Sequence, residues 1–80
     1  MKIVLLLRGD VSSWYAATLM ERGHEVAIHG GGTIHGHLIK DYAEYDGCLL
    51  IGSDPDLVEI ADHLETIGMP IWRNLADVPK

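Results

Sequence analysis

Two short segments of this chain are apolar at every position, and they constrain the fold more than any other feature. Residues 3–7 read IVLLL, and residues 48–51 read CLLI. A strand with one face in solvent alternates apolar and polar residues, so an unbroken apolar run indicates a strand that is covered on both faces. Parallel sheets with helices on both sides provide that environment. The two runs therefore predict the central strands of a parallel α/β sheet.

Two further apolar segments and the stretches between them complete this pattern. We expect strands at residues 2–7, 25–29, 47–52 and 69–73, with helices at residues 12–22, 34–44 and 55–67. Because crossovers between parallel strands are right-handed, the simplest strand order is 2-1-3-4. The prediction is one domain over residues 1–80: a minimal flavodoxin-like or Rossmann-like three-layer sandwich with a four-stranded parallel sheet. The segment after residue 73 is expected to be a short irregular end.

Helical periodicity predicts which side chains of the first and last helices face the sheet. In the last helix the spacing i, i+3, i+4, i+7 selects a single apolar face, made of Leu57, Ile60, Ala61, Leu64 and Ile67. In the first helix the corresponding face comprises Tyr15, Ala16, Leu19 and Met20. Trp14 falls on the opposite side, where a large indole is unexpected. We expect both His24 and His63 at the surface.

Charge and composition exclude several functions. The net charge is −6, and the six Lys and Arg residues are scattered, so nucleic acid is not an expected partner. The single cysteine permits no internal disulfide, and the longest N-terminal apolar run is too short for a signal sequence or a membrane span. We therefore expect a cytoplasmic protein without a membrane partner. Its small core favours a homo-oligomer, with Trp14 and Trp72 as interface candidates.

Polar residues gather where the predicted strands end. All carboxyl ends of a parallel sheet lie on one edge, where ligands bind, most often at the point where strand order reverses. A small-molecule site there would contain Arg8, Gly9, Asp10, Gly30, Gly31, Gly32, Ser53, Asp54 and Asn74. The alternative is that these residues only form turns and helix caps, as Asp54 before Pro55 would. The opposite edge is expected to hold only tight connections.

The glycine and histidine segment at residues 29–37 raises two further possibilities. Gly30, Gly31 and Gly32 could present backbone amides to a phosphate, but the spacing matches neither a dinucleotide fingerprint nor a P-loop, and a flexible turn is the alternative. The histidines at 29, 35 and 37 have no Cys or carboxylate at a recognised metal spacing. We expect no metal and no cofactor.

Residues 45–72, YDGCLLIGSDPDLVEIADHLETIGMPIW, resemble the second half of the nucleoside 2-deoxyribosyltransferase-like superfamily, which includes deoxynucleotide N-glycosidases. In that family an apolar strand ends in a polar turn, a helix carries a Glu five residues later, and Gly-x-Pro leads into the next strand. Asp54, Glu59 and Gly68-Met69-Pro70 occupy those places.

The resemblance implies a small nucleotide- or nucleoside-binding domain with N-glycosidase activity on deoxynucleotides. Glu59 would attack the anomeric carbon, Asp10 or Asp54 would donate a proton or orient the sugar, and Arg8 or the glycine segment would hold a 5′-phosphate. From helical position alone, Glu59 points away from the apolar face and is an ordinary acidic residue near a helix start. The alternative function is a non-enzymatic, oligomeric protein-interaction module that retains the fold without the active site.

Overall fold

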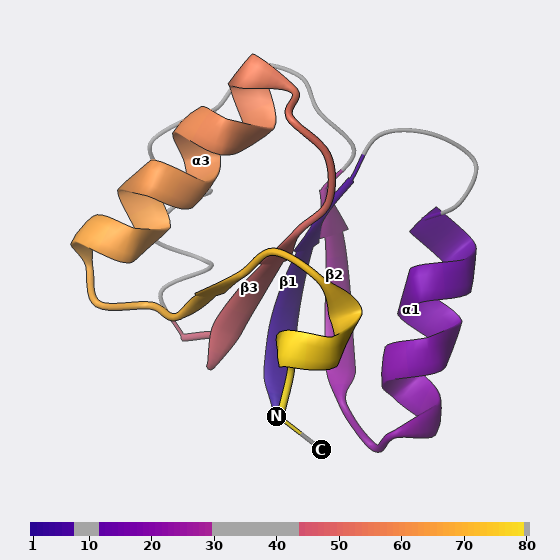
Figure 1. Cartoon of the computed structure of the whole chain (residues 1–80). Helices are drawn as coiled ribbons and strands as arrows, with labels where there is room; N and C mark the ends of the chain where they lie inside the picture. The colour runs from indigo at the N-terminus through magenta and orange to yellow at the C-terminus, as the bar shows by residue number, and fades with distance from the viewer. Residues whose placement is uncertain (8–11, 30–43, 80) are drawn as a thin grey trace.

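The structure is a computed structural model that describes residues 1–7, 12–29 and 44–79. One sheet contains the strands β1 (Lys2–Leu6), β2 (Glu25–His29), β3 (Gly47–Leu50) and β4 (Ile71–Trp72). All adjacent strands are parallel and their order is β2-β1-β3-β4, which confirms the predicted topology. The helices α1 (Ser12–Glu21) and α3 (Pro55–Thr66) lie on opposite sides of the sheet (Figure 1). The helix expected at residues 34–44 falls, apart from its last residue, outside the described residues.

Strand β1 is the centre of the core because it is buried on both faces. The side chains of Ile3, Val4, Leu5 and Leu6 are all fully buried. Val4 and Leu6 face α3, whereas Ile3 and Leu5 face α1, as expected when successive side chains point to opposite faces. Each face contributes to a separate apolar cluster, which confirms the interpretation of the unbroken run.

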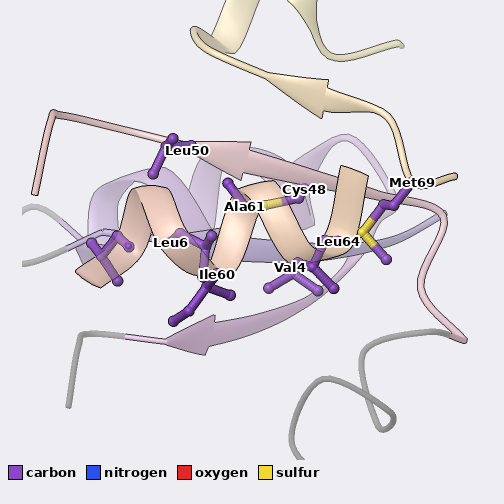
Figure 2. Packing of buried hydrophobic residues seen from close by; sticks show 9 residues of the cluster. Val4, Leu6, Cys48, Leu50, Ile60, Ala61, Leu64 and Met69 are labelled. Carbon is purple, nitrogen blue, oxygen red and sulfur yellow. The ribbon is translucent and has the colours of Figure 1, made fainter. Parts of the chain in front are cut away.

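Helix α3 covers one face through a single apolar stripe. The cluster on this side joins side chains of β1 and β3 to those of the helix, as Figure 2 shows for Val4, Leu6, Cys48, Leu50, Ile60, Ala61, Leu64 and Met69. Ile67, which we expected in this stripe, is instead half exposed. The helix ends one residue earlier, at Thr66, and Gly68 turns the chain with a positive φ of 92°. The end of the helix therefore carries Ile67 off the apolar face.

The other face is covered by α1 and by the C-terminal segment together. Ala16 and Leu19 of α1 pack against Ile3, Leu5 and Leu49, while Trp72, Leu75 and Val78 pack against the same cluster. Residues 75–77 form a short 3₁₀ helix, η1 (Leu75–Asp77), and Val78 behind it is only 3% exposed. The expectation of an irregular end is therefore wrong: this segment supplies a core residue.

Two other surface assignments are also wrong. Met20 is 61% exposed although its helical position suggested contact with the sheet, because α1 makes that contact mainly through Ala16 and Leu19. His24, expected at the surface, is 8% exposed and hydrogen-bonded at both ring nitrogens. His63 is exposed, as predicted.

Gly47 opens β3 and lies beneath the indole of Trp72. A Cβ atom at residue 47 would overlap the six-membered ring of this indole, so the close packing requires glycine. Leu49 and Trp72 pair across β3 and β4, which places the ring on the α1 side of the sheet. Trp72 is half-buried there and packs against Gly47 and against the cluster that contains Leu49 of β3.

Gly47→Ala is expected to lower the free energy of unfolding by about 1–3 kcal/mol, because the added methyl group overpacks the site beneath the indole. Urea denaturation followed by circular dichroism measures the change. In a Trp72→Leu background the smaller side chain leaves room, so the same substitution should cost less. Equal stability of Gly47→Ala and the unsubstituted protein would contradict this packing.

Candidate functional site

The candidate site lies at the carboxyl edge of the sheet, where β1 and β3 end side by side. Leu6 pairs with Leu50, and the amide N–H of Ile51 donates to the carbonyl of Leu6 at 3.0 Å. Gly52 then turns the chain with a φ of 92°, which brings Ser53 to the surface ahead of α3. The strand order reverses between β1 and β3, so this turn borders the position where doubly wound sheets bind ligands.

Asp54 caps the N-terminus of α3. Its Oδ1 atom accepts a hydrogen bond from the amide N–H of Asp56 at 3.0 Å, and its carbonyl accepts from Val58 at 2.9 Å. Pro55 occupies the first helical position, where its missing N–H has no cost. The capping function that we weighed as the alternative for Asp54 is therefore present in the structure.

Asn74 caps η1 in the same manner. The amide N–H of Ala76 donates to Oδ1 of Asn74 at 3.0 Å. Asn74 follows β4 and therefore lies at the carboxyl edge of the sheet. Its side-chain oxygen, however, is already bonded within the turn that leads the chain to the α1 side. This second cap has no clear signal in the sequence, because no long apolar periodicity follows Asn74.

Glu59 lies on the solvent-facing side of α3. Leu57 and Ile60, its near neighbours in the helix, are fully buried against the sheet, whereas Glu59 is exposed. Within the described part of the chain, the carboxylate of Glu59 makes no hydrogen bond or ion pair. Asp54 caps the helix that carries Glu59, yet Glu59 does not face the end of β1.

The start of α3 is rich in hydrogen-bond acceptors. Asp54 and Asp56 place two carboxylates at this end of the helix, and the first helical residue is a proline without an N–H. A phosphate would meet negative charge here instead of the open amides that usually bind anions at helix N-termini. Neutral groups that donate hydrogen bonds, such as sugar hydroxyls, suit this surface better.

The remaining residues of the predicted site lie outside the described residues. These are Arg8, Gly9 and Asp10 after β1, and Gly30, Gly31 and Gly32 after β2. The residues just before them are placed: the amide N–H of Leu7 donates to the carbonyl of His29 at 3.3 Å. Leu7 and His29, the described residues that precede these two segments, therefore lie side by side at the carboxyl edge.

Cys48 has no nucleophilic role in this arrangement. It is fully buried between β3 and α3, and this burial raises the pKa of its thiol from 9.0 to about 12, against a smaller lowering by Arg73. The thiolate is the reactive form, so the side chain stays inert near neutral pH.

Within residues 1–7, 12–29 and 44–79, no group of His, Cys, Asp and Glu side chains could hold a metal ion. Across these same ranges, no helix is long and apolar enough to cross a membrane.

A cavity of about 220 Å³ lies at the opposite, amino-terminal edge, where we expected only tight connections. Its lining comes from the turn before β3 and from the loop between α3 and β4, namely Tyr45, Asp46, Ile67, Gly68, Met69 and Pro70. One oxygen of Asp46 accepts the backbone N–H of Lys2 at 2.8 Å. Gly68, which turns the chain after α3 with a φ of 92°, lines this hollow, and the lengths of the two connections do not reveal it in the sequence.

Comparisons of the chain with protein-family models, curated proteins and solved structures found no match.

Asp54→Ala is expected to lower the free energy of unfolding by about 0.5–2 kcal/mol, because the amide N–H of Asp56 loses its acceptor. Asp54→Asn retains an oxygen at the same position and should cost much less. Thermal and urea denaturation of both variants provide the measurement. If Asp54→Ala were as stable as the unsubstituted protein, the cap would not contribute to the stability of the fold.

Proposed function

We propose that this chain is a small nucleoside- or nucleotide-binding domain whose ligand lies at the carboxyl edge of the sheet, between the ends of β1 and β3. The observation that supports the proposal is the strand order, since its reversal falls between these two strands. The turn at residues 51–54 borders this position and carries an exposed serine next to a carboxylate. Hydroxyl and carboxylate groups at a strand end are suited to bind the hydroxyls of a sugar.

The charges at this edge favour one orientation of the ligand. Asp54 and Asp56 disfavour a phosphate against the start of α3, so the sugar or the base lies there. The family resemblance implies that Arg8 or the glycines at 30–32, which lie outside the described residues, would hold a 5′-phosphate. Nucleosides should therefore bind at least as well as their monophosphates to the surface formed by residues 51–54.

N-glycosidase activity is the finer form of the proposal, and it rests on the resemblance to the deoxyribosyltransferase-like superfamily. Glu59 would attack the anomeric carbon of the sugar, the bond to the base would break, and Asp10 or Asp54 would supply the proton that the base takes with it. This step requires contact between the carboxylate of Glu59 and the sugar. Because Glu59 lies on the outer side of α3, the geometry favours binding over turnover.

A nuclear magnetic resonance titration with deoxynucleosides and their 5′-monophosphates tests both forms. We expect the amide resonances of Leu7, Ile51, Gly52 and Ser53 to shift on ligand addition, because these residues border the strand-order reversal. Shifts confined to Tyr45, Asp46 and Gly68 would place the ligand in the amino-edge cavity instead. Spectra unchanged across the whole panel would reject nucleoside binding.

Release of free base in the same samples over time tests the catalytic form. If Glu59 is the nucleophile, Glu59→Gln should reduce the release at least about a hundredfold while the fold is retained. Glu65→Gln is the matched control, because Glu65 is another exposed glutamate of the same helix. Equal loss in both variants, or no loss in Glu59→Gln, would remove Glu59 from the mechanism.

Self-association through α1 is the second candidate function. Trp14 is 59% exposed on this helix, and its ring contacts Tyr15 edge-to-face with the ring centroids 4.9 Å apart. An exposed indole on a helix of a small domain is typical of a contact surface. Trp72, the other interface candidate, already packs over Gly47 and against the apolar cluster, so Trp14 is the stronger of the two.

Sedimentation equilibrium tests the second candidate. If the chain forms a homo-oligomer through Trp14, Trp14→Ala should weaken the association about thirtyfold or more, as expected of a buried interface tryptophan. Ile67→Ala is the control, since Ile67 is an exposed apolar residue at the end of α3, on the opposite side of the sheet from α1. A monomer at all concentrations, or equal weakening by both substitutions, would contradict this role.

A further inference from the structure

The amino-edge cavity has an apolar floor that belongs to the core. Met69 is only 6% exposed and is part of the cluster on the α3 side, at the end of that cluster where β3 begins (Figure 2). The amide N–H of Cys48 donates to the carbonyl of Pro70 at 2.9 Å, which holds the loop after α3 against the start of β3. The volume of about 220 Å³ lies just below that of sites for drug-sized ligands, so the cavity suits a small molecule.

The loop that forms one wall of the cavity is held by its own hydrogen bonds. The amide N–H groups of Ile67 and Met69 donate to the carbonyl of Leu64 at 3.2 and 3.1 Å, and that of Gly68 donates to the carbonyl of Glu65 at 2.9 Å. A Cβ atom at residue 68 would meet no other atom within 4 Å, so the space beside this glycine stays open. The cavity is therefore preformed, as small-molecule sites usually are.

Asp46 places a carboxylate in the lining at a fixed position. Its Oδ2 atom accepts the amide N–H of Lys2 at 2.8 Å, and its own amide N–H donates to the carbonyl of Lys2 at 2.7 Å. Within the described residues, no other hydrogen bond or ion pair is made by this carboxylate. A carboxylate can accept about four hydrogen bonds, so most of this capacity is available to a ligand that donates.

The electrostatics at this edge favour a positive charge in the cavity. Helix α3 ends next to it, and the carbonyl end of a helix carries a partial negative charge, which faces the same hollow as the Asp46 carboxylate. The carboxylates of Glu44 and Glu65 are exposed nearby. The ammonium of Lys2 lies over the ring of Tyr45, 5.9 Å from its centroid, and makes no ion pair with Asp46. An aromatic ring of the lining thus already contacts one cation.

We propose that the amino-edge cavity binds a small organic cation: a primary ammonium or guanidinium group on a short apolar chain. The cationic group donates to the carboxylate of Asp46 and lies toward the end of α3, while the apolar chain packs on Met69 and Pro70. An anion would meet two negative features and is excluded from the same space. The site lies at the opposite edge of the sheet from the proposed nucleoside, so neither proposal depends on the other.

Three probes with the same four-carbon chain separate charge from shape: n-butylamine, which is an ammonium at neutral pH, the neutral n-butanol and the anion butyrate. We expect n-butylamine to shift the amide resonances of Asp46, Gly68 and Met69 with a dissociation constant of about 1–10 mM, the range open to so few heavy atoms. Binding of n-butanol should be at least about tenfold weaker, because it lacks the charge-assisted hydrogen bond to the carboxylate. Butyrate should leave these resonances unchanged.

Asp46→Asn tests the carboxylate while keeping an oxygen that can accept the amide N–H of Lys2. This variant should bind n-butylamine at least about tenfold more weakly than the unsubstituted protein. Asp62→Asn is the matched control for general attraction of amines to an acidic protein, since Asp62 is an exposed aspartate of α3, and it should bind as before. Equal affinities for n-butylamine and n-butanol, an unchanged affinity in Asp46→Asn, or no saturable shift at these residues would each overturn the proposal.

Discussion

The structure depends on one requirement: β1 is apolar on both faces, so both faces must be covered by a chain of 80 residues. Among the described residues, helix α3 covers one side, through Leu57, Ile60 and Leu64. On the other side α1 contributes few core residues, and the indole of Trp72 and the side chain of Val78 complete the cluster. The C-terminal segment is therefore as much a part of the core as a helix would be. Removing it would expose the central strand, a cost that a domain of this size can hardly offset.

The parts of the fold that could be predicted from the sequence are those that follow from local periodicity. The unbroken runs at residues 3–7 and 48–51 identified the two buried strands, and the handedness of crossovers then left one simple strand order. The stripe of α3 was predicted in all but its last member. The same reasoning placed Ser53, Asp54 and Asn74 after strand ends. The sequence could not assign the roles of these residues, because a residue type favours capping but the backbone geometry decides it. In the structure Asp54 and Asn74 both act as caps.

The parts that could not be predicted arise from contacts between residues far apart in the chain. Val78 lies between Asp77 and Pro79 in a short segment without helical or strand periodicity, so the local pattern does not mark it as a core residue. Its burial follows from the return of η1 to the sheet. His24 is buried because its partners are Met1 and Pro79, which no spacing rule connects to it. Met20 is the opposite case, a residue predicted to be buried that is exposed. Helical position indicates on which face a side chain lies, but not how much of that face contacts the sheet. The amino-edge cavity likewise depends on how two separate loops meet.

The parallel arrangement also sets how this chain must fold. The four described strands form no hairpin, and each ladder between them joins distant residues: Lys2 with Glu25, Ile3 with Gly47, and Cys48 with Ile71. To form each of these ladders the chain must first close a long loop, which costs conformational entropy before the two strands make any contact. Topologies of this kind fold more slowly than those built from neighbouring segments. Until β3 and α3 arrive, the apolar strand β1 remains exposed to other unfolded chains. The same run of residues that specifies the native sheet is thus the segment most prone to intermolecular association during folding.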